Sequence, residues 1–446
     1  MSGLQAFLDE LGDLRFGQPA RSDVVPDFAW RLRRVAGAIG AVELGERVVG
    51  EVDEDDVHGR FVPHATGPRP LVFSAAVWSR DPVALYVVSD LHLDERAEAR
   101  LFSDERQGRQ LSSLCERVAR DDGSELIVLG DAFDFTAMQP PPKGLGKFFR
   151  ELDVPREEPR RRALPELLAA VRESNPVALE SLARLTESAP VTFVPGNHDY
   201  QLGEPGAGDA LASAGIRARL ERSAVRRLAG RTIVLQHGHE LDEGNDKPGG
   251  SGEVLTAALH HAVIPFLRHR GPPPHVRFDP DRLVALRPEE AVVSVLQRWL
   301  DEKTFRRFFR AFLRLLAENG FLPRPLSWLA GMVSAERVRS AVAEQDRLWE
   351  HTGRHAIEVL KGKRHLPHGA PQPDVAVLGH THVLDWAVER GRLYVNLGTW
   401  TERAFDANSP RDASLPLLHV EASNGRLRVS LSDLSAADLE LQRYEG

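Results

Sequence analysis

The fold of this chain is decided by Ala84-Leu85-Tyr86-Val87-Val88-Ser89-Asp90-Leu91-His92, an apolar run followed at once by a carboxylate and an imidazole. A short continuous apolar run is typical of a strand that is buried on both faces. Open α/β sheets carry their ligand crevice beyond the carboxyl ends of such strands. We therefore expect Asp90 and His92 to lie where the chemistry takes place.

Four further stretches repeat this arrangement. They are Leu126–Leu129 before Gly130-Asp131, Val191–Val194 before Gly196-Asn197-His198-Asp199, Ile233–Leu235 before His237-Gly238-His239, and Val375–Leu378 before Gly379-His380-Thr381-His382. Because each polar motif follows a candidate strand, the motifs are predicted to meet at one place. Asp90 and His92 are two residues apart, as are the histidines of the last motif, so an extended backbone would project each pair to one side.

The side chains of these motifs suit a pair of divalent transition-metal ions. Two neighbouring metals can hold both the attacking and the leaving oxygen of a phosphoryl displacement, and they lower the pKa of a bound water enough to supply hydroxide near neutral pH. Carboxylate, amide and imidazole ligands together favour manganese, iron, zinc or nickel over calcium and magnesium, and the motifs contain no cysteine ligand. We expect two such ions, with manganese as the first candidate.

In this order, the five motifs resemble those of the calcineurin-like metallophosphoesterases over residues 84–240 and 374–400. The resemblance implies three sets of metal ligands: Asp90, His92 and His382 for one ion, Asn197, His237 and His380 for the other, and Asp131 as the bridge. It also implies that His198 protonates the leaving alkoxide as the general acid, and that Asp199 fixes the orientation of His198.

Three neighbours of these residues have roles that the sequence leaves less defined. Asp134 and His239 either orient a ligand or cap the next turn. Asn396 follows another candidate strand and is similar to the asparagine of an Asn-x-Gly motif in family members. We expect Asn396 to pack against the site rather than to react.

The resemblance implies a hydrolase of phosphate esters or phosphoanhydrides, hence a phosphatase or phosphodiesterase, in which a metal-bridging hydroxide attacks phosphorus. Gly130-Asp131-Ala132-Phe133-Asp134 and a basic amphipathic helix are similar to features of bacterial UDP-2,3-diacylglucosamine pyrophosphohydrolases, which act at the membrane surface. That subfamily typically has arginine where His198 stands. The expected substrate is a phosphorylated small molecule or a lipid-linked one, such as a nucleotide-sugar lipid.

Two alternative functions stay open. Repair nucleases of the superfamily keep the sequence Asn-His-Asp, so a metal-dependent nuclease or nucleotide phosphodiesterase is one alternative. A net charge of −8 disfavours nucleic acid as a partner, because its phosphates need a basic surface. The other alternative is a non-catalytic scaffold or binding module, since members such as the retromer subunit have lost catalytic residues, whereas every expected ligand and His198 are present here.

Candidate helices separate the candidate strands, which predicts an α/β fold. By resemblance, this is a metallophosphoesterase-type sandwich of two mixed β-sheets flanked by helices. A long stretch of helical pattern between two of the motifs adds a large helical cap insertion. The expected helices cover residues 106–120, 162–187 and 209–214, with Pro176 kinking or dividing the second. The closing strands, expected at residues 392–396, 415–421 and 426–431, are predicted to form an antiparallel finish.

The chain divides into four expected segments: an amino-terminal extension (1–83) with a candidate strand at 71–73, the first part of the catalytic core (84–240), a helical cap insertion (241–373) and the second part of the core (374–446). A connection as long as the insertion must have structure of its own. Because the insertion separates two metal motifs, we expect it to stand beside the active site.

The stretch Lys303–Leu316 within the insertion is strongly amphipathic. One helical face carries Phe305, Phe308, Phe309, Phe312 and Leu316, and the opposite face carries Lys303, Arg306, Arg307, Arg310 and Arg314. Two interpretations stay open. Either the aromatic face packs on the insertion's own core and the arginines are solvated, or the helix contacts an anionic membrane or steers a phosphate-bearing substrate.

Composition agrees with a globular enzyme. The chain has 446 residues, of which 42% are apolar, enough for a full core. Cys115 is the only cysteine, so no intrachain disulfide can form, and we expect it to be buried on a helix. No secretory signal and no transmembrane run is visible in the sequence. The expected location is the cytoplasm, peripheral to the membrane if residues 303–316 bind lipid.

Overall fold

The computed structural model describes residues 82–95, 100–242, 245–273, 279–286, 291–320, 348–403, 413–436 and 439–446. All of them belong to one compact unit, Arg69–Gly446. The strand expected at residues 71–73 lies outside the described residues, together with most of the expected amino-terminal extension. The four segment boundaries therefore stay predictions.

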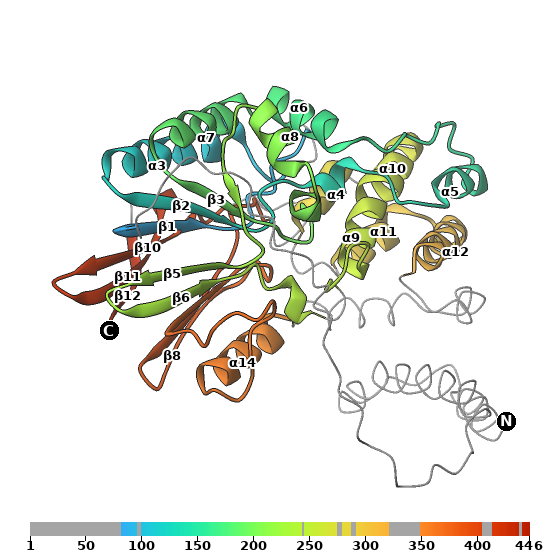
Figure 1. Cartoon of the computed structure of the whole chain (residues 1–446). Coiled ribbons are helices and arrows are strands. Elements are labelled where there is room, and N and C mark those ends of the chain that lie inside the picture. Colours follow the sequence, from blue (N-terminus) through green and yellow to red (C-terminus); the bar gives the residue numbers. More distant parts are fainter. Residues whose placement is uncertain are drawn as a thin grey trace, which may run out of the picture. The chain divides into compact units, whose positions relative to one another are not determined.

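Two mixed β-sheets form the centre of this unit, as predicted (Figure 1). The first sheet has the order β12-β11-β10-β1-β2-β3-β4, with parallel pairing from β1 to β4 and antiparallel pairing from β1 to β12. Its strands are β1 (Ala84–Val88), β2 (Ser124–Leu129), β3 (Val191–Val194), β4 (Arg219–Leu220), β10 (Pro416–Ser423), β11 (Arg426–Asp433) and β12 (Leu439–Glu445). The second sheet has the order β5-β6-β7-β9-β8. Its strands are β5 (Ala224–Leu228), β6 (Arg231–Leu235), β7 (Val375–Leu378), β8 (Leu384–Glu389) and β9 (Arg392–Leu397).

The predicted antiparallel finish is wrong for one strand. β9 lies in the second sheet and pairs parallel with β7, while only β10 and β11 extend the first sheet in antiparallel fashion. The cause is the edge strand β8, which lies between β7 and β9 in the sequence. Because β8 and β9 are antiparallel neighbours, β9 runs in the same direction as β7 and can pair with it in parallel. Most residues of β8 are only half-buried, so it has no apolar run that would have identified it.

The main core lies between the two sheets. Leu85 and Val87 of β1 meet Ile233 and Leu235 of β6 there, whereas Tyr86 belongs to the core on the opposite face of the first sheet. Successive side chains of a strand point to opposite faces. Because both faces of the central strands are covered, their sequences are continuously apolar rather than alternating.

Helices cover the outer face of each sheet (Figure 1). On the first sheet they are α3 (Arg109–Arg120), α6 (Leu164–Ser174), α7 (Pro176–Ser188) and α8 (Ala207–Ser213), and on the second sheet α14 (Leu348–Leu360). Pro176 is the first residue of α7, so it divides the predicted helix, because proline fits the first helical turn but not the interior. Cys115 is buried on α3, as expected.

The insertion is helical in its described parts. It is preceded by η3 (His239–Leu241), and its first described elements are α9 (Ser251–Ala258), η4 (Leu259–Val263), α10 (Ile264–Arg270), η5 (Pro280–Ala285), α11 (Ala291–Trp299) and α12 (Glu302–Glu318). Helix α14, which covers the second sheet, also belongs to it. Helices α9 to α12 share a hydrophobic core with α5 (Leu145–Glu151), which follows the second metal motif. His261 of η4 also contacts the carbonyl oxygen of Ala137, at 3.0 Å. The insertion therefore packs against the segment that follows the second motif.

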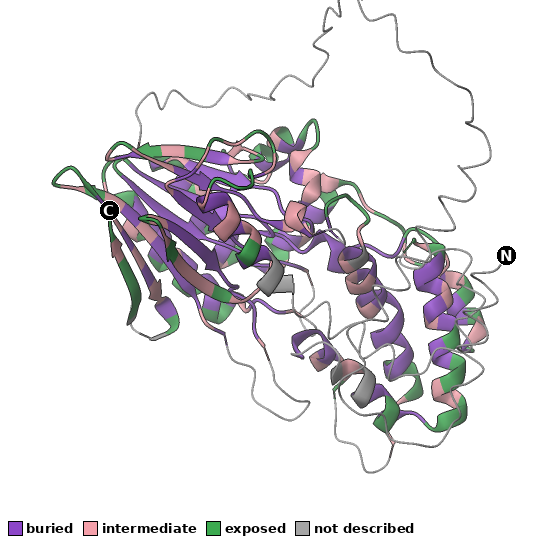
Figure 2. Cartoon of the chain, turned by 90° about the horizontal axis from the view of Figure 1, so that it is seen from below, coloured by how far each residue is buried: buried purple, intermediate pink, exposed green. Residues whose placement is uncertain are grey.

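The aromatic face of α12 points into this core. The ring of Phe308 lies 4.9 Å from that of Phe266 and 5.9 Å from that of Phe148, measured between ring centroids. The basic face carries exposed Lys303 and Arg310, and Figure 2 shows buried and exposed residues on the helices of this region. The predicted packing of the aromatic face is confirmed. Two of the arginines that this interpretation left solvated, Arg307 and Arg314, instead pair with Asp153 and Glu151. Membrane contact through the basic face stays a proposal. Among the described helices, none has the length and apolar character needed to span a membrane.

Candidate metal centre

The five motifs meet at the carboxyl ends of adjacent strands. β1, β2 and β3 are neighbours in the first sheet, and β6 and β7 are neighbours in the second. The loops continue this pairing, because the backbone N–H of His92 donates to the carbonyl of Asp131 (2.9 Å) and that of Gly379 donates to the carbonyl of His237 (2.9 Å). Strand pairing thus brings residues from distant parts of the sequence to one place.

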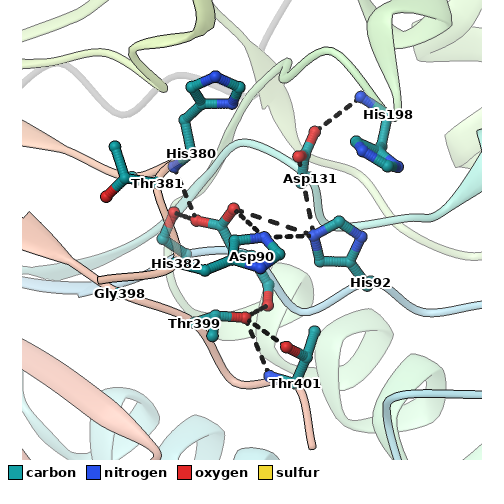
Figure 3. Close-up of polar contacts among 12 residues, drawn as sticks. Asp90, His92, Asp131, His198, His380, Thr381, His382, Gly398, Thr399 and Thr401 are labelled. Atoms are coloured by element: carbon teal, nitrogen blue, oxygen red, sulfur yellow. Dashed lines mark hydrogen bonds and ion pairs between the residues drawn. The ribbon is translucent and has the colours of Figure 1, made fainter. Parts of the chain in front are cut away.

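Asp90, His92 and His382 form the first cluster, the three residues that the resemblance assigned to one metal (Figure 3). Nε2 of His92 lies 3.1 Å from Nε2 of His382, and Nε2 of His382 lies 3.2 Å from Oδ1 of Asp90. Two imidazole nitrogens and a carboxylate oxygen that face one another can all bind the same cation. The two histidine motifs, separated by 290 residues, are therefore joined here.

Asp131 lies at the centre of the site. Its Oδ2 is 3.1 Å from Nε2 of His237 and 3.7 Å from Nε2 of His92, and its Oδ1 accepts a hydrogen bond from the backbone N–H of His198 at 2.8 Å. Nδ1 of His237 lies 3.2 Å from the carbonyl oxygen of Leu129, to which it can donate a proton. This contact leaves Nε2 of His237 as the nitrogen that faces Asp131.

Several buried polar atoms at the site lack a hydrogen bond among the described residues. Three of them are Oδ1 of Asp90, Oδ1 of Asn197 and Nε2 of His237. The first lies 3.2 Å from Nε2 of His382 and the third 3.1 Å from Oδ2 of Asp131, but neither contact has the geometry of a hydrogen bond. Leaving such atoms without a partner is costly, so native structures rarely do so. All three belong to predicted metal ligands, and their oxygen and nitrogen atoms are the donor types that a divalent transition metal binds. The residues present therefore fit a metal centre.

The electrostatics of the site also favour cations. Burial lowers the pKa of His237, but the carboxylates of Asp131 and Asp90 raise it more strongly, to about 10. Burial likewise opposes ionisation of Asp131, yet the charges of His237 and His198 hold its pKa well below the usual value. Carboxylates that keep buried imidazoles protonated create a negative electrostatic potential. A divalent cation would be attracted by this potential and would displace the protons from the imidazoles.

The backbone at the predicted ligands is not extended, so the argument from two-residue spacing is wrong. Of ten described non-glycine residues with positive φ, five are predicted ligands, with φ between 47° and 71°: Asp90, His92, Asp131, His380 and His382. Such conformations cost about 1–3 kcal/mol each in the general case and occur at sites where function needs them. Sharp left-handed turns, rather than continued strands, aim these side chains at one another.

Glycines before the ligands make room for them. A Cβ atom on Gly130 would lie 2.0 Å from Nδ1 of His237, and one on Gly379 would lie 2.1 Å from Oγ of Ser89. Real Cβ atoms essentially never approach other atoms this closely. The glycines of the Gly-Asp and Gly-His motifs are thus required by the approach of neighbouring motifs, which the sequence pattern alone does not reveal.

Asp134, rather than Asp199, orients His198, which corrects the prediction for Asp199. Oδ1 of Asp134 lies 2.8 Å from Nδ1 of His198, and Oδ2 lies 3.4 Å from Nδ1 of His92. Asp134 also accepts from the backbone N–H of Ala137 and so caps the short helix α4 (Phe135–Met138). Asp134 therefore both orients histidines of the site and caps the next turn, the two roles that the sequence left open.

Asp199 supports the backbone of the site instead. Its carboxylate accepts from the N–H of Gly196 at 2.6 Å and from the N–H of Phe133 at 3.2 Å. Burial, with the nearby charge of Asp131, raises the pKa of Asp199 to about 7. The carboxylate thereby ties the third motif to the second motif.

Residues outside the motifs hold Asp90 in place. The carbonyl oxygen of Asp90 accepts from Oγ1 of Thr399 at 3.0 Å (Figure 3). It also accepts from the backbone N–H of Trp400 at 3.1 Å. Asn396 donates to the carbonyl of Gly379 at 2.8 Å, so it packs the histidine loop as expected. Sequence reasoning missed Thr399 and Trp400 because neither has a side chain typical of a metal site.

Two neighbours of the second predicted cluster were also not identified from the sequence. Nε2 of His380 lies 3.2 Å from Oδ2 of Asp242. Oε2 of Glu240 lies 3.4 Å from Nδ1 of His239, the other residue for which the sequence left two roles open. Burial lowers the pKa of His239 to about 4. Its ring centroid is 5.4 Å from that of His237, so His239 stands next to the cluster.

The insertion places a buried carboxyl group near His198. Glu253, in the first turn of α9, has only 6% of its surface exposed, and Oε2 accepts from the N–H of Gly249 at 3.0 Å. Burial raises the pKa of Glu253 to about 7, and the group interacts electrostatically with His198 and Asp131. Glu253 is therefore a titratable group of the insertion that charges at the metal centre influence.

Replacing Glu253 by glutamine should stabilise the metal-free protein at alkaline pH. Because the folded-state pKa is above the unfolded one, the stability linked to this group is full below about pH 4.5 and is lost as the pH rises through about 7. The amide oxygen of glutamine can still accept from the N–H of Gly249. The substitution removes the free-energy cost of ionising a buried carboxyl group, on the order of 3 kcal/mol above pH 7. Thermal melting in chelator should therefore show a higher Tm for the variant at pH 8.5 and little difference at pH 5.

The matched control is Glu173→Gln on the exposed surface of α6. This control should shift Tm equally at both pH values. An identical Tm difference at pH 5 and pH 8.5 for Glu253→Gln would show that burial does not penalise the ionised form of Glu253.

One comparison with known proteins agrees with a phosphoesterase-type metal centre. The model of the calcineurin-like phosphoesterase family matches residues 84–384. No curated protein matches the chain.

Three solved structures illustrate the similarity to distant proteins. Vacuolar Protein Sorting 29 from Cryptosporidium parvum is 14% identical, with a TM-score of 0.29, over 82% of this chain and 99% of that chain. A conserved uncharacterized protein from Streptococcus pneumoniae, a predicted phosphoesterase, is 10% identical, with a TM-score of 0.27, over 81% and 97%. Phosphopantetheinyl hydrolase from Mycobacterium tuberculosis is 15% identical, with a TM-score of 0.25, over 72% and 90%. At TM-scores this low, these likenesses carry no argument about function.

Proposed function

The chain belongs to the calcineurin-like phosphoesterase family, and from this premise we propose that it is a two-metal hydrolase of phosphate esters or phosphoanhydrides. The observation that carries the proposal is the position of Asp131, whose Oδ2 faces both Nε2 of His237 at 3.1 Å and Nε2 of His92 at 3.7 Å. A carboxylate between two imidazole clusters is suited to bridge two cations. Manganese is the first candidate, with iron, zinc and nickel as alternatives.

The residues that would hold the ions are those expected from the resemblance: Asp90, His92 and His382 for one, Asn197, His237 and His380 for the other, and Asp131 between them. When bound, the two ions would polarise the phosphoryl group and make water a sufficient nucleophile at neutral pH. The chain's own contribution is to orient the ligands. Asp134 contacts Nδ1 of His92 and the carbonyl of Leu129 contacts Nδ1 of His237, so that each Nε2 faces the cluster.

His198 is proposed as the general acid. Its Nδ1 is held by Asp134 at 2.8 Å, which leaves Nε2 to donate a proton to the leaving oxygen. Burial lowers the pKa of His198, but the charges of Asp134 and Asp131 raise it to about 10, so the imidazole is protonated at neutral pH before metals bind. A positioned acid of this kind contributes about 10²–10⁴-fold to the rate when the leaving group is poor.

Metal removal and reloading test this proposal directly. Protein stripped with a chelator should hydrolyse neither bis(p-nitrophenyl) phosphate nor p-nitrophenyl phosphate, and manganese should restore activity toward the diester, the monoester or both. Calcium, which the ligand set disfavours, is the matched control and should restore little. Two bound metals per chain without turnover of either ester would favour the scaffold interpretation or a strict requirement for the natural substrate.

We propose a lipid-linked pyrophosphate, such as a nucleotide-sugar lipid, as the substrate class to test first. The support is the basic face of α12, where Lys303, Arg306 and Arg310 are exposed. Arg307 and Arg314 of the same helix instead pair with Asp153 and Glu151 of the segment after the second motif. Arg306 pairs with Glu302 of its own helix. We propose that Lys303, Arg306 and Arg310, which do not pair with that segment in the described part of the chain, meet anionic lipid.

Sedimentation with anionic liposomes tests membrane contact by this face. The wild-type protein should sediment with vesicles that contain phosphatidylglycerol, and the double variant Arg306→Glu/Arg310→Glu should lose most of this binding because each reversal replaces attraction by repulsion. Arg120→Glu on α3 is the control for an exposed arginine elsewhere. Equal sedimentation of wild type and double variant would remove the membrane proposal and leave the hydrolase proposal intact.

A further inference from the structure

A buried carboxylate of the insertion contacts the predicted ligand His380. Oδ2 of Asp242 lies 3.2 Å from Nε2 of His380, and only 5% of the surface of Asp242 is exposed. The side chain of His380 is 8% exposed, so both partners are shielded from water. An ionic hydrogen bond in such surroundings fixes the orientation of the imidazole more strongly than one at the surface.

A second buried residue connects Asp242 to the helices of the insertion. Nδ2 of Asn245 donates to Oδ2 of Asp242 at 2.5 Å, and Oδ1 of Asn245 accepts from the backbone N–H of Gly252 at 3.0 Å. Asn245 is 5% exposed. Gly252 lies in the first turn of α9, and a Cβ atom at this position would lie 2.5 Å from Oδ1 of Asn245. A continuous hydrogen-bonded path therefore runs from His380 through Asp242 and Asn245 to α9.

The path has a chemical consequence for His380. A neutral imidazole has one N–H and one lone pair, and the hydrogen bond made by one nitrogen decides which nitrogen can bind a metal. When Nε2–H is donated to Asp242, Nδ1 carries the lone pair. Carboxylates that hold metal-binding histidines in this way also raise the basicity of the ligand nitrogen, and their loss costs about 10–100-fold in metal affinity.

We propose that Asp242 is a positioning residue that fixes His380 as an Nδ1 ligand, and that Asn245 makes this ligand depend on the docking of α9. The inference rests on the proposed two-metal function. The helical insertion is thus part of the metal centre, because it supplies Asp242, the hydrogen-bond partner of the core ligand His380. Sequence reasoning had assigned no role to either residue.

Metal retention of the purified protein tests the proposal without relying on activity. Wild type, Asp242→Ala, Asp242→Asn and Asn245→Ala would be loaded with manganese and dialysed against a graded chelator, and bound metal per chain would be measured by mass spectrometry. Asp242→Ala should retain one ion as wild type does and bind the other about 10–100-fold more weakly. Asp242→Asn should recover part of the loss, because its amide oxygen can still accept the Nε2 proton. Asn245→Ala should weaken the same ion to a smaller extent.

The matched control is Asp281→Asn, another buried carboxylate of the insertion, which pairs with Arg268 instead. It should retain both ions with wild-type affinity. Unchanged retention in Asp242→Ala, or equal weakening of both ions in Asp242→Ala and the control, would overturn the proposal. Failure of the wild-type protein to bind any ion would instead overturn the two-metal function itself. Circular dichroism identifies a variant that has not folded, and in that case Asp242→Asn and Asn245→Ala decide the result.

Discussion

Asp131→Asn should abolish turnover while the protein stays folded. Oδ2 of Asp131 lies 3.1 Å from Nε2 of His237 and 3.7 Å from Nε2 of His92, so replacing Asp131 removes the charge shared by the two clusters. Metal ions contribute several kcal/mol to stabilisation of the transition state, and each 1.4 kcal/mol is a factor of ten. We expect a loss of about 10³-fold or more in kcat/KM for bis(p-nitrophenyl) phosphate with manganese.

Asparagine keeps the size of the side chain and the oxygen that accepts from the N–H of His198. A fold defect is therefore not the expected cause of the loss, and thermal melting with metal analysis would verify this. The control is Asp121→Asn, which removes a carboxylate that accepts from Tyr86 on the helix-covered face of the first sheet. Activity of Asp131→Asn within about threefold of wild type would contradict the two-metal mechanism.

His198→Ala should lower kcat by about 10²–10⁴-fold on an alkyl phosphate ester and much less on an aryl ester. An alkoxide needs a proton as it leaves, whereas p-nitrophenolate leaves without one. The measurement is the dependence of kcat on the pKa of the leaving group, which should be steeper for the variant than for the wild-type protein. An equal loss on all esters would mean that His198 contributes binding or site structure rather than the proton.

Variants of the two neighbouring carboxylates distinguish their roles. Asp134→Asn should steepen the same leaving-group dependence, because Asp134 holds Nδ1 of His198 at 2.8 Å and raises its pKa. Asp199→Asn should instead lower Tm and act similarly on all esters, since Asp199 binds the backbone N–H groups of Gly196 and Phe133. If Asp199→Asn alone changed the leaving-group dependence, the original assignment of Asp199 as the orienting residue would be restored.

The sequence by itself determined the strands that carry the motifs. Buried strands of an α/β sheet need continuous apolar runs, and those before Asp90, Asp131, Asn197, His237 and His380 are visible without any structure. The four described edge strands, β4, β5, β8 and β12, were not predicted, because an edge strand with one solvent-facing side needs no such run. The division at Pro176 was predictable because proline acts on its own helix.

Only the tertiary structure decided which residue contacts which. In the sequence Asp199 directly follows His198 and Asp134 lies 64 residues before it, but pairing of β2 with β3 puts Asp134 against His198 and Asp199 against the backbone. The left-handed turns at the ligands likewise arise from contacts between loops and not from residue spacing. Asp242 and Asn245 carry no motif, and their meeting with His380 depends on how the insertion docks. Local patterns fix local structure, whereas hydrogen bonds between distant segments exist only once the sheets have brought those segments together.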